Sequence, residues 1–384
     1  MRPIRVALFP CAYNEVDGVA NTMRHFESFA RRQQLPLLNV HGGFDSYHRH
    51  DGCIEQVEFE RRWPKFSLDA KHDFDMNFWR YLTCAEDAVR KFRADLVHIT
   101  GPSDVGQLGA LVAHRLGIPL AASWHTNVHE YAERRALPLL SFLPASAKRG
   151  LGRQIQASSL YLSSRFYKIA QVLFAPNQEL ISKLETFTGK PCHMMSRGVD
   201  QQLFHPCRRT RRDHQFVIGY VGRLTNEKNI QFLVELESAL LAEGCSNFRL
   251  SIVGQGAEEV WLRTHLRHAE FAGVLQGERL AAAYANFDAF AFPSRTDTFG
   301  NVVLEALASG VPTVVTNGGG PKYIVQHGSS GFIATMTKSS LSTSPLCSKI
   351  RGFGPRCLAS RGSARWLRRG IRCLPTSTKF TSQL

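Results

Sequence analysis

The chain has 384 residues, which is long for one α/β core, so two domains are expected. Hydrophobic residues make up 43% of it, and no run approaches the roughly 20 apolar residues of a membrane-spanning helix. The N-terminus enters a strand without a secretory signal, and the nine cysteines form no C-x-x-C pair. These features favour reduced thiols in the cytoplasm over a disulfide framework or a zinc site.

The net charge of +15 suggests a nucleic-acid partner until the charges are located. Ten of the 47 Lys and Arg residues lie in residues 335–384, which contain no Asp or Glu. The preceding 334 residues therefore carry 37 basic against 32 acidic side chains. The excess charge belongs to the C-terminal tail, and no nucleic-acid partner is predicted for the rest of the chain.

The first elements alternate between strand and helix. Residues 6–9 form an apolar run typical of a buried strand, and an amphipathic helix follows through about residue 31. Gly18 lies near the start of that helix, where an anion or a sugar can meet backbone N–H groups. A second strand is expected over residues 37–40. Residues 42–71 are polar and irregular, and they are interpreted as a surface excursion.

The same alternation continues through a helix at residues 78–92, a strand at 94–100, a helix ending near 116 and a strand at 120–123. Short loops between such elements predict βαβ units in a parallel sheet, with a functional site at the carboxyl ends of the strands. His125 follows one of these ends. It is a candidate catalytic or substrate-binding residue, and the alternative is a purely structural histidine.

A basic segment comes next. Between residues 137 and 168 there is no Asp or Glu, and the basic side chains are Lys148, Arg149, Arg153, Arg165 and Lys168. Leucine and phenylalanine residues precede them. A helix of this composition can lie on an anionic membrane surface, which predicts a peripheral membrane contact at the inner face. A solvated helix face is the alternative interpretation.

Strands at residues 172–176 and 191–199 complete a first domain that spans residues 1–204. The arginine-rich connector at 205–214 is typical of an interdomain linker. The pattern restarts with a strand at 217–222, which begins a second domain at residues 215–334. Arg223 and Lys228 flank the turn that follows this strand. Two cations at a helix start oppose the helix dipole, so an anion is expected between them.

Further strands are predicted at residues 248–253, 289–292 and 313–316, with a helix at 280–286. The loop after residue 292 carries Asp297, and Thr298 is the expected N-cap of a helix that begins near Phe299. Gly300 leaves room for a ligand at that helix start. Glu305 follows eight residues after Asp297. A plain strand–helix unit with a capped start is the alternative to a binding site.

Together these features resemble the retaining, nucleotide-sugar-dependent glycosyltransferases of family 4, also described as glycosyl transferases group 1. The most specific motifs are G-R-L-T-N-E-K-N at residues 222–229 and P-S-R-T-D-T-F-G-N-V-V-L-E-A-L-A-S-G-V-P at 293–312. Supporting motifs lie at 15–19, 124–127, 175–177 and 196–200. The resemblance implies the GT-B fold, an α/β fold with two Rossmann-like domains whose parallel sheets face each other across a cleft.

The resemblance also implies roles for individual residues. Arg223 and Lys228 would bind the donor diphosphate, which the backbone at Gly222 also approaches. Asp297 would lie near the donor sugar, and Glu305 would bind ribose hydroxyls. The remaining implied donor contacts are the backbone N–H groups of Phe299, Gly300, Asn301 and Val302, the loop glycine Gly18, and His125 facing the donor sugar.

The implied reaction is hexosyl transfer from a nucleotide diphosphate sugar to a hydroxyl group, with retention. Arg223 and Lys228 would stabilise the charge that develops on the leaving diphosphate, so neither a metal nor another cofactor is expected. The mannosyltransferase-like motif favours GDP-mannose as donor, with UDP-glucose next, and a lipid or saccharide acceptor. A nucleotide-sugar epimerase and a non-catalytic nucleotide-sugar-binding protein are the alternatives.

The resemblance ends near residue 334. The family continues with acidic and alanine-rich helices, whereas residues 335–384 are rich in Ser, Arg, Pro, Gly and Cys. Two hypotheses account for this: a translated shifted reading frame, or a diverged basic tail that stays disordered. Either one bears on whether this chain has the closing helices that an active enzyme would need.

Overall fold

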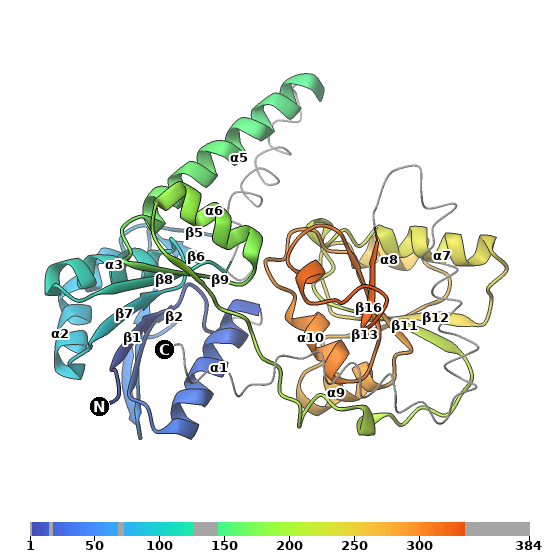
Figure 1. Ribbon diagram of the computed structural model, residues 1–384, viewed down its shortest axis with the longest axis horizontal. Helices are drawn as coiled ribbons and strands as arrows, with labels where there is room; N and C mark the ends of the chain where they lie inside the picture. Colours follow the sequence, from blue (N-terminus) through green and yellow to red (C-terminus); the bar gives the residue numbers. More distant parts are fainter. Residues whose placement is uncertain (1, 15–17, 68–72, 126–144, 335–384) are drawn as a thin grey trace. The chain divides into compact units, whose positions relative to one another are not determined.

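The structure, a computed structural model, describes residues 2–14, 18–67, 73–125 and 145–334. The basic tail at 335–384 therefore lies outside the described residues. The chain divides into two compact units, Met1–Ser196 and Arg197–Leu384 (Figure 1). The sequence placed a domain boundary at residue 204 and a linker at 205–214, and those bounds remain a prediction.

Unit 1 is built on a sheet with strand order β10-β9-β8-β7-β1-β2-β4-β3. All of its neighbouring strands are parallel except the antiparallel pair β3 and β4. Its strands are β1 (Val6–Phe9), β2 (Leu37–Gly43), β3 (Tyr47–Asp51), β4 (Ile54–Glu60), β7 (Leu96–Ile99), β8 (Leu120–Ser123), β9 (Val172–Ala175) and β10 (Cys192–Met194), and a separate antiparallel hairpin joins β5 (Lys65–Ser67) to β6 (Asp73–Asp75).

The helices of unit 1 connect these strands and cover the sheet (Figure 1). They are α1 (Gly18–Gln33), η1 (Phe78–Tyr81), α2 (Leu82–Phe92), α3 (Asp104–Leu116), α5 (Ala145–Tyr167) and α6 (Gln178–Thr188). Two of these helices begin with a side-chain N-cap of a type that the sequence favours. The Ser103 side chain accepts from the N–H of Gly106, and the Asn177 side chain accepts from the N–H of Leu180. The motif at residues 175–177 thus ends a strand and starts a helix.

The interpretation of residues 42–71 as an irregular surface excursion is wrong. β4 lies in this segment and pairs with β2 along its whole length. The sequence pattern did not indicate this strand because one of its buried residues, Glu58, is acidic. The Glu58 carboxylate accepts hydrogen bonds from the Asn14 amide, at 2.9 Å, and from the backbone N–H of Asp45, at 3.2 Å. A hydrogen-bonded carboxylate can be buried at a modest energetic cost.

Unit 2 has a fully parallel sheet with strand order β13-β12-β11-β14-β15-β16. Its strands are β11 (Phe216–Val221), β12 (Phe248–Val253), β13 (Ala269–Gly273), β14 (Ala289–Phe292), β15 (Thr313–Thr316) and β16 (Gly331–Ala334). Its helices are η2 (Pro206–Arg208), η3 (Asn226–Lys228), α7 (Phe232–Ala242), α8 (Glu259–His265), α9 (Gly277–Ala285), α10 (Asn301–Ala308) and η4 (Pro321–Tyr323).

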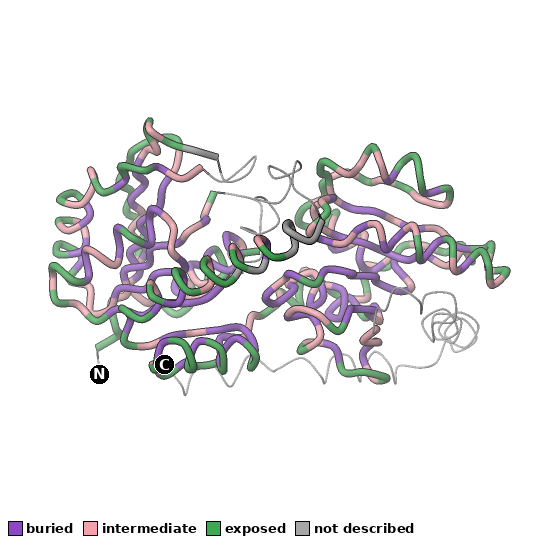
Figure 2. The backbone as a smooth tube through the Cα atoms, turned by 90° about the horizontal axis from the view of Figure 1, so that it is seen from above, coloured by how far each residue is buried: buried purple, intermediate pink, exposed green. Residues whose placement is uncertain are grey.

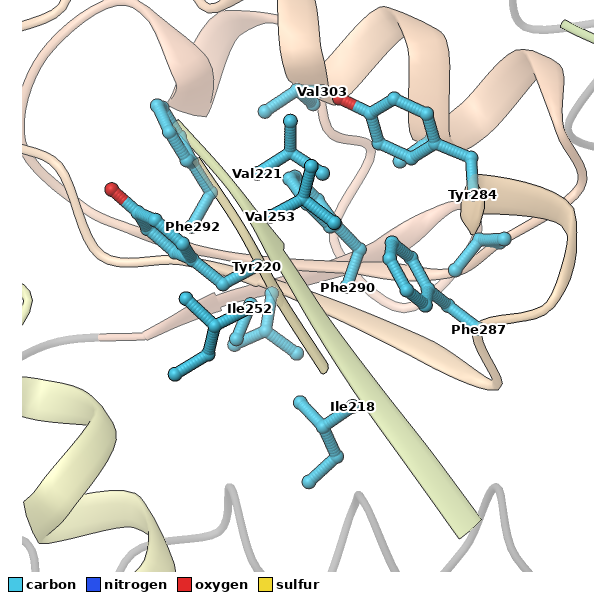
Figure 3. Packing of buried hydrophobic residues seen from close by; sticks show 14 of the residues in the cluster. Ile218, Tyr220, Val221, Ile252, Val253, Tyr284, Phe287, Phe290, Phe292 and Val303 are labelled. Atoms are coloured by element: carbon cyan, nitrogen blue, oxygen red, sulfur yellow. The ribbon is translucent and has the colours of Figure 1, made fainter. Parts of the chain in front are cut away.

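Burial follows this layered arrangement in each unit. The strands of both sheets are largely buried, whereas buried and exposed residues alternate along the helices (Figure 2). In unit 2 the rings of Phe290 and Phe292 stack in the core with centroids 6.1 Å apart, and Tyr220 lies beside Phe292 (Figure 3). These aromatic residues support the two strands whose ends carry the charged loops described next.

Candidate functional site

The candidate site of unit 2 lies where its strand order reverses. β11 is the first strand of the sheet in sequence, with β12 on one side and β14 on the other. Ligands of open parallel sheets bind outside the carboxyl ends of the strands at such a switch point. The loops that leave these ends are residues 222–231, after β11, and residues 293–300, after β14. They contain Arg223, Lys228 and Asp297.

Polar contacts join the two loops directly. The Lys228 ammonium lies 2.7 and 2.9 Å from the two carboxylate oxygens of Asp297. The Thr296 hydroxyl donates to the Glu227 carbonyl at 3.1 Å, and the Asn229 amide donates to the Pro293 carbonyl at 3.3 Å. The sequence indicated these residues separately. The structure brings the predicted cation and the predicted carboxylate together as an ion pair.

Both partners of this pair are largely withdrawn from water. The side chain of Lys228 is 11% exposed and that of Asp297 is 21% exposed. Burial on its own would raise the pKa of the Asp297 carboxyl, but the charge and the hydrogen bonds of Lys228, with a contribution from Arg223, bring this pKa below its usual value. Asp297 is therefore a carboxylate at neutral pH.

Arg223 is more exposed than Lys228, and its backbone is fixed by a hydrogen bond. Its carbonyl accepts a hydrogen bond of 2.9 Å from the hydroxyl of the buried Tyr220. Its guanidinium lies 3.9 Å from the Glu227 carboxylate. Gly222, just before it, is packed against the next turn: a Cβ on Gly254 would come within 1.9 Å of the Gly222 carbonyl oxygen.

The helix start after Asp297 differs from the expectation. Thr298 is not the N-cap, because α10 begins at Asn301 and its N-cap is Gly300. Gly300 has a φ of 102°, a left-handed conformation that glycine adopts without strain and most other residues do not. The N-terminal end of α10, with Asn301 and Val302 as its first residues, thus follows a sharp turn beside Asp297, and the helix dipole makes this end positive.

A third loop supports this turn. The N–H of Gly320 donates to the Asp297 carbonyl at 2.6 Å, and the Thr316 hydroxyl donates to the Ser294 carbonyl at 3.1 Å. A Cβ on Gly320 would lie 2.0 Å from the Thr298 carbonyl oxygen. The loop after β15 therefore lies directly against the backbone of residues 294–299, and only a residue without a side chain fits there.

Glu305 lies in the second turn of α10 and has an aromatic partner. Its carboxylate accepts a hydrogen bond of 2.8 Å from the Tyr284 hydroxyl. Tyr284 is a buried residue of α9 whose hydroxyl points toward Val303 and the α10 side of the core (Figure 3). Burial raises the pKa of Glu305, and the bond from Tyr284 opposes this only in part. Tyr284 was not predicted as a site residue from the sequence.

Two predicted site residues, Gly18 and His125, belong to unit 1. Gly18 is the first residue of α1, and its carbonyl accepts from the Thr22 hydroxyl at 2.7 Å. His125 follows β8 and is 4% exposed. Its Nε2 lies 2.7 Å from the Ser123 hydroxyl, which lies 2.9 Å from Nε2 of His98 in the neighbouring strand β7.

This His98–Ser123–His125 chain was not predicted from the sequence. His98 is buried in the sheet, and this burial lowers its pKa to about 4, so its ring is neutral at neutral pH. The available signal in the sequence was that the polar residues His98 and Ser123 lie near the ends of two adjacent parallel strands. The other members of the tryptophan–histidine motif, residues 126 and 127, lie outside the described part of the chain.

Three further observations complete the geometry. Within the described ranges, no group of three or more His, Cys, Asp and Glu side chains could hold a metal ion. No helix of the described residues is long and apolar enough to cross a membrane. The six cysteines within the described ranges are free thiols.

The fold and these strand-end loops define a class of protein. The chain is similar to the structure of sucrose-phosphate synthase from Thermosynechococcus elongatus, with a TM-score of 0.69 at 15% identity, covering 97% of this chain and 93% of that one. It is also similar to Anabaena HepE in complex with UDP-glucose, with a TM-score of 0.64 at 17% identity, covering 99% and 100%. The fold is the predicted GT-B fold of nucleotide-sugar-dependent glycosyltransferases.

The sequence comparisons then identify the family. Residues 40–203 match the model for Glycosyltransferase Family 4, and residues 215–342 match that for glycosyl transferases group 1. A GDP-mannose-dependent alpha-mannosyltransferase from Corynebacterium glutamicum is 30% identical over 342 residues, covering 87% of this chain and 77% of the relative. One of the same description from Mycobacterium tuberculosis is 32% identical over 343 residues, covering 86% and 83%. The chain belongs to glycosyltransferase family 4.

The family confirms the prediction of a glycosyltransferase. The alternatives, a nucleotide-sugar epimerase and a non-catalytic nucleotide-sugar-binding protein, are not favoured by these similarities.

Proposed function

We propose that this glycosyltransferase transfers mannose from GDP-mannose to a hydroxyl group of a lipid or saccharide acceptor, with retention of configuration. The relatives from Corynebacterium glutamicum and Mycobacterium tuberculosis support the donor, because both are named GDP-mannose-dependent. The structure of HepE in complex with UDP-glucose makes UDP-glucose the second candidate. The observation that carries the proposal is the Lys228–Asp297 pair beside the start of α10.

In the proposed mechanism, unit 2 binds the leaving nucleotide. Cleavage of the sugar–phosphate bond builds negative charge on the diphosphate. Lys228, Arg223 and the backbone N–H groups of residues 299–302 at the positive end of α10 would stabilise that charge as it develops. The bidentate contact with Asp297 holds the Lys228 ammonium in one position, so little reorganisation is needed during the reaction.

The uncharged parts of the donor would meet the remaining site residues. Asp297 would contact the donor sugar, and the Glu305 carboxylate would accept from ribose hydroxyls while Tyr284 fixes its orientation. Gly18 and His125 of unit 1 would approach the diphosphate and the sugar. The leaving phosphate would take the proton of the acceptor hydroxyl, so neither carboxylate acts as a nucleophile.

A donor panel tests this proposal. Nucleotide release by the full chain is measured with GDP-mannose, UDP-glucose, GDP-glucose and UDP-mannose, which separates the base from the sugar. We expect the fastest release from GDP-mannose and a loss of at least about 100-fold in the Lys228→Ala variant, because a transition-state charge contact is removed. Faster release from UDP-glucose would overturn the donor assignment, and release that does not depend on Lys228 would overturn the site.

We also propose that unit 1 binds the surface of an anionic membrane, which would give access to a lipid acceptor. The C-terminal end of α5, near residues 161–169, supports this (Figure 1). Tyr161, Leu162 and Ile169 are 59%, 70% and 49% exposed, and Arg165 and Lys168 are exposed beside them. Their spacing places all five on one side of the helix and its last turn. Apolar and cationic side chains on one face suit an anionic bilayer surface.

Liposome flotation tests this contact. Charge reversal at Arg165 and Lys168 together should reduce flotation with vesicles of phosphatidylglycerol and phosphatidylcholine by several-fold, since each basic residue near the surface contributes about 1 kcal/mol. Reversal of Lys183, an exposed residue of α6, is the control and should change little. Equal flotation of all variants would contradict the proposal. The side chains of Lys148, Arg149 and Arg153, which the sequence also indicated, lie outside the described set.

For the location of the protein, we propose the cytoplasm, at the inner face of the membrane, because the free cysteines agree with a reducing compartment. Cell fractionation with a protease-protection assay tests this. Digestion of the protein in right-side-out membrane preparations would contradict it.

A further inference from the structure

A third cation lies at the start of α10, and neither of the family's two most specific motifs contains it. Arg197 is the first residue of unit 2. Its guanidinium carbon lies 5.5 Å from the centroid of the Phe299 ring. Its Nη1 lies 3.4 Å from the side-chain oxygen of Asn301, which is the first residue of the helix. The side chain is half-buried, and its contacts with Phe299 and Asn301 fix its position beside the start of α10.

The charges of the predicted diphosphate site show why a further cation is needed. Lys228 is paired with Asp297, and Arg223 has the Glu227 carboxylate 3.9 Å from its guanidinium. These two cations and two carboxylates cancel, and the exposed Arg295 leaves the loops at residues 222–231 and 293–300 with one net positive charge. A nucleoside diphosphate carries at least two negative charges. Arg197 would raise the net charge beside the α10 start to two positive charges.

A bound anion would also improve the electrostatic environment of Arg197. A cation beside a helix N-terminus opposes the helix dipole, and burying part of it removes hydration as well. The Phe299 ring offsets part of this cost through a cation–π contact. An anion placed between the guanidinium and the N-terminal end of α10 would contact both and would reverse the unfavourable term.

We propose that Arg197 is a third phosphate-binding residue of the donor site and contacts the diphosphate of the bound nucleotide. The guanidinium is planar and presents its donors in a fork that fits two oxygens of a phosphate group. Phe299 and Asn301 fix the plane of this fork before the ligand arrives. The inference rests on the proposed donor site, because it assigns another residue to the same anion.

Calorimetric titration of the full chain with GDP, GMP and guanosine tests the assignment. Arg197→Ala should weaken GDP binding about 10- to 100-fold, as expected for the loss of charge-assisted hydrogen bonds to phosphate. Guanosine binding should stay unchanged, because guanosine has no phosphate. Arg197→Lys should be intermediate, since it keeps the charge and loses the fork. Asn301→Ala should weaken GDP binding less than Arg197→Ala, because it only frees the guanidinium.

The controls separate failure of the inference from failure of the proposed site. Arg263→Ala removes an exposed arginine of α8 that pairs with Glu259, and it should leave all three affinities unchanged. If Lys228→Ala weakens GDP binding but Arg197→Ala and Arg197→Lys do not, the inference is wrong and the donor site stands. If neither Lys228→Ala nor Arg197→Ala changes GDP affinity, the donor site itself is wrong. Equal losses for GDP and guanosine would show a structural role and also overturn the inference.

Discussion

The two units end their central strands in opposite chemistry. After β11 and β14, unit 2 places ionised side chains in direct contact, with Lys228 bonded to both oxygens of Asp297. At the ends of β7 and β8, unit 1 places a hydrogen-bonded chain in which a serine hydroxyl joins two histidines. Both arrangements are largely buried and both lie at the carboxyl ends of parallel strands.

The difference indicates which part of a ligand each unit suits. Paired charges beside a helix N-terminus can accept an incoming anion with little movement, because the cation already sits in a fixed position and its counter-charge is local. A hydrogen-bonded chain of a hydroxyl and two imidazole rings offers directed donors and acceptors, which suits sugar hydroxyls. The proposed division of a nucleotide sugar into phosphate and sugar ends follows from this contrast.

The largest effect on the charged site of unit 2 is expected from a change in the loop after β15, which packs against the turn that carries Asp297. In Gly320→Ala, the added Cβ would meet the Thr298 carbonyl at 2.0 Å, and backbone atoms cannot move aside easily. We expect the free energy of unfolding to fall by at least about 2 kcal/mol and GDP binding to be lost. Urea denaturation and calorimetry measure the two effects.

Gly198→Ala is the matched control for this substitution, because nothing lies within 4 Å of the Cβ position there. The control should be close to neutral in both measurements. A stable Gly320→Ala variant that binds GDP normally would show that the loop after β15 does not determine the position of Asp297.

The charged pair is tested by a double-mutant cycle in GDP binding. Lys228→Ala should weaken binding about 10- to 100-fold through loss of a charged contact. Asp297→Asn should have a smaller effect, because its main partner is Lys228 itself. The double variant should show a coupling of about 0.5 to 3 kcal/mol between the two positions. Additive effects would mean that the ion pair does not position the ammonium.

The His98–Ser123–His125 chain of unit 1 is tested by removing its central hydroxyl. Ser123→Ala leaves two buried histidine nitrogens without their partner, so the free energy of unfolding should fall by about 1 to 3 kcal/mol. Turnover should fall about 10-fold if the chain orients His125. Ser309→Ala is the control, since the buried Ser309 hydroxyl has no hydrogen-bond partner among the described residues, and its loss should be nearly neutral. Equal effects of the two variants would contradict a role for the chain.

The smallest expected effects distinguish the two carboxylates of the motif by pH. Folding lowers the pKa of Asp297 and raises that of Glu305. Asp297 therefore contributes stability above its unfolded pKa of 3.8, and this is lost as the pH falls through the lower folded value. The contribution of Glu305 is fully present below its unfolded pKa of 4.5 and is lost as the pH rises through the higher folded value.

Two isosteric variants measure these opposite slopes. Asp297→Asn should destabilise the protein at neutral pH, and its difference from the wild type should shrink toward about pH 3. Glu305→Gln should compare most favourably with the wild type at neutral pH and least favourably in acid. Urea titrations over this range give both curves. Parallel curves for the two variants would show that Asp297 and Glu305 have similar environments.

The sequence predicted the strands of the two units well where they are short apolar runs. Residues 6–9, 120–123 and 289–292 are confirmed as β1, β8 and β14 without a change of bounds. β4 was missed because its buried face includes Glu58, whose partner Asn14 lies 44 residues earlier in the chain. A burial that depends on a distant partner leaves no local periodicity to detect.

The candidate site shows the same limit. The motifs indicated Lys228 and Asp297 and predicted that both lie at strand ends, but their direct contact spans 69 residues and depends on the pairing of β11 with β14. The N-cap of α10 was misplaced because threonine is a common cap, whereas the left-handed turn at Gly300 comes from the loops packed around it. Arg197 belongs to the motif at residues 196–200, which supported the family resemblance but for which no ligand contact was predicted.

One edge of the sheet of unit 1 has a consequence for how the protein behaves in a concentrated solution. β3 forms an edge of the eight-stranded sheet, and all five of its residues are exposed. Among the described strands it pairs with β4 alone, and its side chains His48, Arg49, His50 and Asp51 are polar or charged. An exposed apolar edge would invite strands of other molecules to add to it. β3 thus protects the long, partly apolar strand β4 against sheet-to-sheet aggregation.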